Sequence, residues 1–535
     1  MDERKPYIDE IKREFPGDVL SEDTSTPGEA YLTIRKESLP RIANFLHEVR
    51  YSTPLLSMFG TDERALDGTY KVYTVFQIPR KPVFIILKVH LKEGELEFPS
   101  ITPLMYAGSP FEREMQDMFG FIPVGNPDTR RMVLHENFPK GIHPLRKDFS
   151  YSTTLDKAEG PYPFHTIEGE GMLEVPVGPV HAGIIEPGHF RFSVAGEPII
   201  NLEIRLHYKH KGIEKLMETL DFNEGGRVAE MVSGDSAVGH VTAYCQAVEK
   251  IAGIETPMLA RYNRMIALEL ERLYNHIADI ESMSTDASFL FGAARAGILR
   301  EEVMSLNDRL TGSRFLKGLV VPGGVTRDLF TAREDIIRTL NEVGKGLKEL
   351  VAILLTSASF LDRVKTTGVL DKKTAEDLAV TGPPARASGI DSDMRRDVPY
   401  EAYGEVRFKV PVYKEGDVFC RLSVRIDEAF ESISIIEQVL KKAVRGPIKA
   451  EIKVGVTQRV APTDYRYALG CVEGWRGAIL YWIMTAPGDK LYRCKIKDPS
   501  FCNWPGLSYA VLGNIIPDFP LCNKSFNLSY AGNDL

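Results

Sequence analysis

A short polar stretch in the middle of the chain carries the residue types best suited to chemistry. It reads M-V-S-G-D-S-A-V-G-H from Met231 to His240, so hydroxyl, carboxylate and imidazole groups follow one another closely. Carboxylate and imidazole groups can carry protons. Together with Asp518 and Cys522 they could also hold zinc or iron, if the two segments meet. A satisfied polar network is the commoner use of such residues, and we expect no metal in this chain.

The cysteines and the loops exclude several cofactor sites. The chain has six cysteines, and no two of them form a Cys-x-x-Cys pair. An iron–sulfur cluster needs a set of four thiolates, so we expect none bound by this chain alone. Few, isolated cysteines are typical of buried thiols in a reducing cytoplasm. Neither the Gly-x-Gly-x-x-Gly pattern nor the Walker pattern is present, which argues against direct nucleotide binding.

Size and charge narrow the class of protein further. The 535 residues are too many for one core, so two or three domains are expected. The net charge of -8 and the pI near 5.9 argue against a nucleic-acid-binding surface. No apolar run reaches the length of about 18 residues that a transmembrane helix needs, and the charged N-terminus has no signal-peptide core.

Hydrophobic patterns indicate which elements hold these residues. Residues 1–150 combine a helix over 38–51 with strands over 70–76 and 83–89, which predicts a small α+β domain. Residues 151–175 are rich in Ser, Thr, Gly, Pro and Glu and predict a linker. From 176 to 535 the spacing is mainly helical; helices are predicted over 223–253, 258–284, 294–310, 333–361 and 426–444. The tail 523–535 is short and polar, and we expect it to be exposed.

Three motifs in the first unit carry a family resemblance. They read E-R-E-M-Q-D-M-F-G from Glu112, G-N-P-D-T-R-R from Gly125 and H-P-L-R-K-D from His143. In order and spacing they resemble the 30-kDa-type subunit of respiratory complex I. Charges of both signs mixed with aromatic residues also suit an ordinary solvated, salt-bridged helix and loop. The resemblance favours a docking surface for neighbouring subunits.

The rest of the chain resembles a second, related family. The motifs E-P-G-H-F-R from Glu186, K-G-I-E-K-L from Lys211 and P-G-G-V from Pro322 are similar to those of the large subunit of membrane-bound NiFe hydrogenases and the 49-kDa-type subunit of complex I. The resemblance covers about residues 60–522. It implies a mainly helical domain like the hydrogenase large subunit, joined to the small N-terminal sheet domain in an overall α+β fold.

The hydrogenase family holds nickel and iron with two Cys-x-x-Cys pairs. In the first pair, both thiols fall on Ser233 and Ser236. In the C-terminal pair, an ungapped match places the thiols on Asp518 and Leu521, with Cys522 one residue out of register. Hydroxyls and a carboxylate do not replace soft thiolates. The resemblance therefore implies a relative that has lost its metal centre, with these four positions lining the emptied cavity.

The resemblance also implies roles for residues around that cavity. His189 matches a histidine that holds the quinone in complex I, whereas the partner tyrosine falls near Gly234, which has no hydroxyl. Glu214 matches a proton-passing glutamate of hydrogenases, and burial would raise the pKa of such a carboxyl. The alternative is a surface glutamate paired with Lys211 or Lys215. With Asp235 added, the expected proton-carrying residues are Glu214, His189 and Asp235, and His181 and His240 are expected just behind the cavity wall.

The favoured interpretation is a core peripheral-arm subunit of a complex I-like, ion-pumping membrane oxidoreductase. It implies a partner small subunit with a 4Fe–4S cluster, a ferredoxin-like subunit and membrane ion-pumping subunits, at the cytoplasmic side of the cell membrane. The electron acceptor would be sulfane or polysulfide sulfur, or a quinone. Two alternatives are a non-catalytic coupler or assembly scaffold and a hydrogenase with an atypical metal site.

Overall fold

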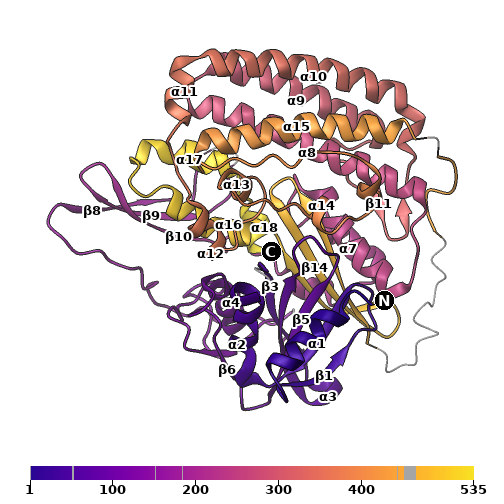
Figure 1. The fold of residues 1–535 in the computed structure, drawn as a ribbon. Coiled ribbons are helices and arrows are strands. Elements are labelled where there is room, and N and C mark those ends of the chain that lie inside the picture. Colours follow the sequence, from indigo (N-terminus) through magenta and orange to yellow (C-terminus); the bar gives the residue numbers. More distant parts are fainter. Residues whose placement is uncertain (1, 51–52, 151, 183–184, 443, 451–464) are drawn as a thin grey trace.

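The computed structural model describes residues 2–50, 53–150, 152–182, 185–442, 444–450 and 465–535. Figure 1 shows a small sheet-based domain, drawn in indigo and purple, lying against a larger, mostly helical domain. This α+β architecture confirms the predicted fold class. None of the helices in these ranges is both long and apolar enough to span a bilayer.

One mixed sheet forms the core of the first domain. Its strand order is β1-β2-β5-β4-β3, in which β2 and β5 run parallel and the other neighbours are antiparallel. The predicted strands over 70–76 and 83–89 are confirmed as β4 and β5. The strands are β1 (Val19–Asp23), β2 (Glu29–Ile34), β3 (Leu55–Glu63), β4 (Thr69–Gln77) and β5 (Phe84–Lys92).

Helices and a second, small strand pair complete this domain. The helix predicted over 38–51 exists, but α2 continues as a π-helical segment, Phe45–Arg50, and residue 51 lies outside the described residues. Ser38 ends a preceding 3-10 turn and makes no capping hydrogen bond. The other elements are α1 (Lys5–Glu14), α2 (Leu39–Asn44), α3 (Arg64–Asp67), β6 (Glu97–Pro99), α4 (Ser109–Phe119) and β7 (Ile122–Val124).

A connecting segment leads into the second domain. Residues 152–171 form neither helix nor strand, and the first strand after them begins at Met172, inside the predicted linker. Three antiparallel strands follow in the order β10-β9-β8. They are β8 (Met172–Val177), β9 (His189–Ala195) and β10 (Ile199–Arg205).

Long helices make up most of the second domain (Figure 1), and α8 packs against both α9 and α15. The helices predicted over 258–284, 294–310 and 426–444 are confirmed as α8, α9 and α15, although residue 443 lies outside the described residues. The two other predicted helices are each divided in two. The helices are α5 (Ile213–Met217), α6 (Phe222–Ala229), α7 (Ala237–Ala252), α8 (Met258–Asp286), α9 (Leu290–Thr311), α10 (Arg333–Thr356), α11 (Ala358–Val364) and α15 (Val418–Leu440).

A three-stranded sheet that the hydrophobic pattern did not predict joins the two domains. Its strands are β13 (Tyr467–Gly474), β14 (Gly477–Ala486) and β15 (Lys490–Lys497). Side chains alternate along β14: Ile479 and Tyr481 pack in the helical core, whereas Leu480 and Trp482 pack against the first domain. Because both faces are covered, the strand is apolar throughout and lacks the alternation that reveals a half-exposed strand.

The C-terminal tail is buried, so the expectation of an exposed tail is wrong. Residues 523–535 lie in or after α17 and form α18, and Ser525, Phe526 and Asp534 are among the buried residues. The remaining short elements are β11 (Val320–Val321), β12 (Gly324–Val325), α12 (Lys372–Asp377), α13 (Pro383–Ala387), α14 (Met394–Asp397), α16 (Ser500–Ala510), α17 (Phe519–Phe526) and α18 (Tyr530–Asp534).

Candidate functional site

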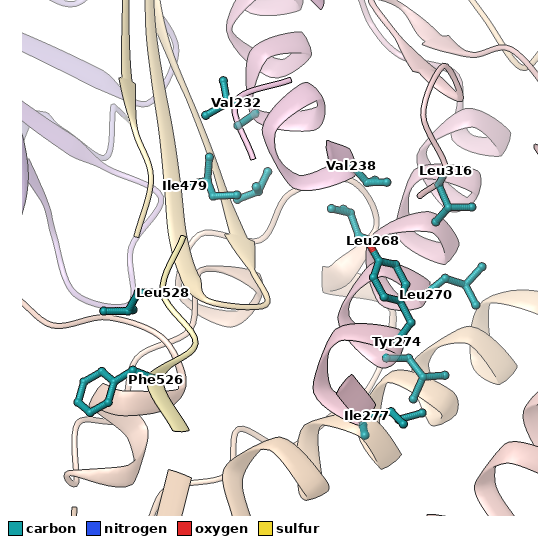
Figure 2. Packing of buried hydrophobic residues seen from close by; sticks show 14 of the residues in the cluster. Val232, Val238, Leu268, Leu270, Tyr274, Ile277, Leu316, Ile479, Phe526 and Leu528 are labelled. Atoms are coloured by element: carbon teal, nitrogen blue, oxygen red, sulfur yellow. The ribbon is translucent and has the colours of Figure 1, made fainter. Parts of the chain in front are cut away.

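The polar stretch forms a tight turn between α6 and α7. Ser236 donates its backbone N–H to the Ser233 carbonyl at 3.0 Å, and α7 begins at the next residue. Val232 before the turn and Val238 after it are both buried, which fixes the turn to the core (Figure 2). The turn itself reaches the surface, because Gly234 is exposed and Met231 is 61% exposed.

A residue of the C-terminal tail faces this turn. The Ser529 hydroxyl lies 2.9 Å from the Ser233 hydroxyl, and both side chains are buried. Phe526 and Leu528, just before Ser529, belong to the same hydrophobic cluster as Val232 (Figure 2). The tail thus brings a third hydroxyl to the two predicted from the sequence.

The predicted C-terminal positions, Asp518 and Leu521, contact other parts of the second domain. Asp518 forms an ion pair with Arg363 at 2.9 Å, and Leu521 is buried in the helical core. Cys522 is also buried; the atoms nearest to Gly368 include its sulfur. Asp518 and Leu521 make no hydrogen bond or ion pair with the Ser233–Ser236 turn in the described part of the chain.

Asp235 is held by an arginine that the sequence motifs did not reveal. Both carboxylate oxygens accept hydrogen bonds from Arg476, each at 2.7 Å. Burial acts to raise the pKa of Asp235, but the charge and hydrogen bonds of Arg476 and the hydrogen bond from Ser233 together lower that pKa. Arg476 also donates to the Asn527 carbonyl, so one guanidinium ties the turn to the C-terminal tail.

The backbone of the turn is held just as firmly. The Asp235 carbonyl accepts hydrogen bonds from Tyr274 at 3.1 Å, Asn275 at 2.8 Å and Trp475 at 3.1 Å. Tyr274 and Asn275 lie on α8, and Trp475 lies between β13 and β14. Three donors from two elements leave the turn little freedom to move.

His240 lies one helical turn into α7 and is fully buried. Its Nε2 lies 3.0 Å from an Asp498 carboxylate oxygen, and its Nδ1 lies 3.1 Å from the Tyr481 hydroxyl. A carboxylate only accepts, so Nε2 carries the proton and Nδ1 accepts from tyrosine. Burial acts to raise the pKa of Asp498, but the hydrogen bonds from His240 and Ser500 and the Arg476 charge together lower that pKa. The role of His240 behind a cavity wall stays a prediction.

The second residue of interest in the tail is a glycine. Gly532 follows Ser529 with the spacing of a Cys-x-x-Cys pair, and its N–H donates to the Ser529 hydroxyl. A Cβ atom added at Gly532 would lie 2.6 Å from the Asp498 carboxyl group. The Asp498 carboxylate therefore occupies the space into which a side chain at this position would point.

Glu214 is buried, so the alternative of a surface glutamate paired with Lys211 or Lys215 is wrong, whereas its role in passing protons stays a prediction. It forms an ion pair with Arg493 at 2.8 Å and another with Lys495 at 3.3 Å, and it accepts the Ile496 N–H at 2.9 Å. Burial acts to raise the pKa of Glu214, but the two cations outweigh it and lower that pKa. The lysines expected as partners point elsewhere: Lys211 donates to the Met231 and Val232 carbonyls of the turn, and Lys215 pairs with Glu218.

The two histidines of the β8–β9 region lie near each other but make no contact with the turn in the described residues. The His189 Nδ1 lies 3.2 Å from the Gly178 carbonyl, and the His181 Nε2 lies 2.7 Å from the Gly188 carbonyl. The His189 ring also packs on Phe164 of the connecting segment, with 5.3 Å between ring centres. Each imidazole thus uses one ring nitrogen in a hydrogen bond to a backbone carbonyl.

These groups define what the site can hold. Around the turn stand the hydroxyls of Ser233, Ser236 and Ser529, with the carboxylates of Asp235 and Asp498 already bonded to Arg476 and His240. In the described residues no group of three or more His, Cys, Asp and Glu side chains has the geometry of a metal site. Hydroxyls are hard, weak donors, so this set does not fit the nickel–iron pair that four thiolates hold.

Comparison with known proteins agrees with both halves of the fold. The family described as "Respiratory-chain NADH dehydrogenase, 30 Kd subunit" matches residues 32–155, and the corresponding 49 Kd subunit family matches residues 293–534. Among solved structures, the membrane-bound sulfane sulfur reductase, an archaeal respiratory membrane complex, has a chain that superposes with a TM-score of 0.63 at 27% identity. That match covers 68% of this chain and 99% of the other.

Relatives that match along the whole length fall into two groups. Formate hydrogenlyase subunit 5 of Escherichia coli is 35% identical, covering 99% of this chain and 93% of the relative. An NADH-quinone oxidoreductase subunit of Aquifex aeolicus is 27% identical, covering 96% of each chain. The chain therefore belongs to the fused 30-kDa and 49-kDa subunit family of complex I-like, hydrogenase-related oxidoreductases.

Proposed function

We propose that this chain is a core peripheral-arm subunit of a membrane-bound, ion-pumping oxidoreductase that passes electrons to an acceptor without a nickel–iron centre. It would form one wall of the acceptor cavity, beside a 4Fe–4S cluster carried by a partner small subunit. The observation that carries this proposal is the contact between the Ser233 and Ser529 hydroxyls. It supports the proposal because the hydrogenase relatives are expected to have sulfur at the position of Ser233, and here two hydroxyl oxygens face each other.

The contact also suggests a new register for the lost ligands. If Ser233 and Ser236 stand for the first pair of cysteines, the residues facing them stand for the second pair. Ser529 and Gly532 have the required spacing and lie beside Ser233 and Asp498. We assign the four former ligand positions to Ser233, Ser236, Ser529 and Gly532, in place of the predicted Asp518 and Leu521.

Sulfane or polysulfide sulfur is the first choice of acceptor. The turn reaches the surface at Met231 and Gly234, so a partner subunit docking there would close a cavity over the hydroxyls. Lys211 and Arg476 reach the turn, and positive charge there suits an anionic polysulfide. A quinone is the second choice, because Gly234 provides no hydroxyl for its head group.

Proton delivery would depend on groups that solvent or a partner subunit can reach. Asp235 has a side chain that is 36% exposed and lies at the mouth of the turn, so it is our candidate for the last proton carrier. His189 remains a candidate on the far side, through the ring nitrogen that does not face Gly178. Glu214 would act through its ion pairs, by positioning Arg493 and Lys495, and could pass a proton only if those pairs open.

The remaining partners follow from the same family. We propose a ferredoxin-like subunit on the electron-input side and ion-pumping subunits in the membrane, with this chain attached peripherally on the cytoplasmic side. The name of the superposed reductase, a respiratory membrane complex, and those of the NADH-quinone oxidoreductase relatives support this assembly. The chain itself would bind no cofactor.

Acceptor assays on the purified complex test the proposal. With reduced ferredoxin as donor, we expect sulfide from polysulfide, or quinol from a short-chain quinone, and no hydrogen. Asp235→Asn should lower turnover at least about tenfold while the clusters keep their EPR signals. Stoichiometric nickel with hydrogen evolution would overturn the proposal in favour of the hydrogenase. Intact clusters without activity toward either acceptor would favour the scaffold.

A further inference from the structure

A cavity of about 480 Å³ lies between the two domains, away from the serine turn. One wall comes from the first domain, at the start of β3 and the end of β4. The other comes from the segment between α12 and α14 of the second domain. Much of the lining is apolar: it includes Leu55, Leu56, Val380, Ile390 and Met394. A pocket of this size and composition can enclose a small organic molecule.

Lys497 lines this cavity and is only 4% exposed. Its ammonium donates one hydrogen bond, to the Ala478 carbonyl at 3.1 Å, and it has no ion pair with any described carboxylate. Lys495, two residues earlier on β15, is equally buried but pairs with Glu114 and Glu214. Burying an uncompensated charge is strongly unfavourable. Lys497 therefore stands out as a buried cation with donors to spare.

The carboxylates on the cavity wall do not neutralise Lys497, because most of them form ion pairs with other cations. Asp391 pairs with Arg80 at 2.9 Å and with Arg396 at 2.5 Å. Asp397 also pairs with Arg396, at 2.8 Å, and Asp377 pairs with Lys373 at 2.7 Å. Of the other two, Glu376 faces Lys372 at 3.5 Å and Glu48 is exposed to solvent. A counter-charge for Lys497 would have to come from a bound molecule.

We propose that the cavity binds a small organic anion, a carboxylate on an apolar chain, with Lys497 as its counter-ion. The ammonium lies near Thr381, since Ala478, whose carbonyl it contacts, donates its N–H to the Thr381 hydroxyl. Thr381 and Gly382 line the same cavity. The carboxylate would sit at this polar end, and the chain would lie along Leu55, Leu56 and the apolar residues of the opposite wall.

The site has a structural connection to the serine turn. A Cβ atom at Gly382 would lie 2.1 Å from the Arg476 carbonyl oxygen, so the loop lining the cavity packs directly on the residue that holds Asp235. A ligand that orders this loop would also order Arg476. This connection gives the bound anion a route by which it would influence the site, although binding itself does not depend on the function proposed above.

Equilibrium dialysis of the purified complex with octanoate tests the inference, and octanol is the neutral probe of matched chain length. We expect one saturable octanoate site per chain and at least tenfold weaker binding of octanol. Lys497→Met should weaken octanoate binding at least tenfold, whereas Lys373→Met, at an exposed lysine on the cavity rim, should change it less than twofold.

Three outcomes would overturn the inference: no saturable octanoate binding up to about 10 mM, equal affinity for octanoate and octanol, or wild-type affinity in Lys497→Met. If the Lys497→Met chain fails to assemble, the comparison of the two probes on the wild-type complex still decides. Because the readout is binding, its failure leaves the acceptor assays and the proposed function untouched.

Discussion

The serine turn and the Glu214 cluster differ in what they keep of the family pattern. The turn loses the thiols but keeps its place, with Ser233 facing Ser529 across two distant parts of the chain. Glu214 keeps the matching side chain, yet Arg493 and Lys495 hold it in a buried ion cluster. The serine turn thus keeps its position with altered chemistry. Glu214 matches the family residue but has a structural role, and both lie in the second domain.

The difference shows that a motif match locates a residue but does not fix its protonation. The environment of Glu214 is set by Arg493 and Lys495 on β15, far away in sequence. Asp235 also pairs with a cation, but its side chain is 36% exposed and faces the mouth of the turn. The two carboxylates should therefore respond differently to mutation.

Removing Glu214 should have the largest effect on stability. Glu214→Ala leaves the guanidinium of Arg493 and the ammonium of Lys495 buried with fewer counter-charges, at about 3–5 kcal/mol of unfolding free energy. Chemical denaturation of the purified complex, followed by intrinsic fluorescence, measures this loss. The exposed Glu168→Ala should stay within about 0.5 kcal/mol of wild type. A loss below about 1 kcal/mol for Glu214→Ala would mean that the ion cluster does not hold the two domains.

Glu214 should also make the stability of the fold depend on pH, because its ionised form contributes to that stability. The folded pKa of Glu214 lies below its unfolded value, so the ionised group stabilises the fold above pH 4.5. That contribution is lost as the pH falls toward the folded pKa. Thermal melts between about pH 5.5 and pH 3 should therefore drop less steeply for Glu214→Gln than for wild type. Parallel melting curves for the two proteins would contradict the lowered pKa.

The sequence predicted the elements better than the contacts. Amphipathic helices such as α8 show a one-sided apolar pattern, so they could be predicted. Strands β4 and β5 could be predicted as well, because each is a β-rich run and a turn at residues 80–82 separates them. Strand β14 could not be predicted from alternation, because both of its faces are buried. Its ten residues between Gly477 and Pro487 do form an Ile-, Tyr- and Trp-rich run bounded by turn residues, which was the available signal.

Only the part of the candidate site that lies in the Met231–His240 stretch was predicted from the sequence. Ser233, Asp235, Ser236 and His240 follow from a single continuous motif. Their partners Arg476, Asp498 and Ser529 come from three other segments, and no local pattern reports such contacts. The S-Y-A-G spacing from Ser529 repeats the S-G-D-S spacing from Ser233. That spacing is the sequence signal that supports the proposed register of the second pair.

Ser529→Ala should have a smaller effect than the loss of Glu214. The hydroxyl bonds to Ser233 and also caps α18 by accepting the Gly532 N–H at 2.8 Å. Losing both should reduce the unfolding free energy by about 1–2 kcal/mol. Ser357→Ala is the matched control, because Ser357 caps α11 in the same way but its hydroxyl bonds only locally. An equal loss in the two variants would show that the Ser233 contact contributes nothing.

A cysteine pair tests the new register through crosslinking, a readout that does not depend on stability. The hydroxyl oxygens of Ser233 and Ser529 are 2.9 Å apart, so Ser233→Cys with Ser529→Cys places two sulfurs within reach of a disulfide. We expect mild oxidation of the purified complex to crosslink this pair, seen as two protected thiols by alkylation and intact mass. Ser233→Cys with Asp518→Cys is the matched control and should remain reduced, because Asp518 pairs with Arg363. Crosslinking of the control pair alone would restore the ungapped match, and with it Asp518 as the residue that faces the turn.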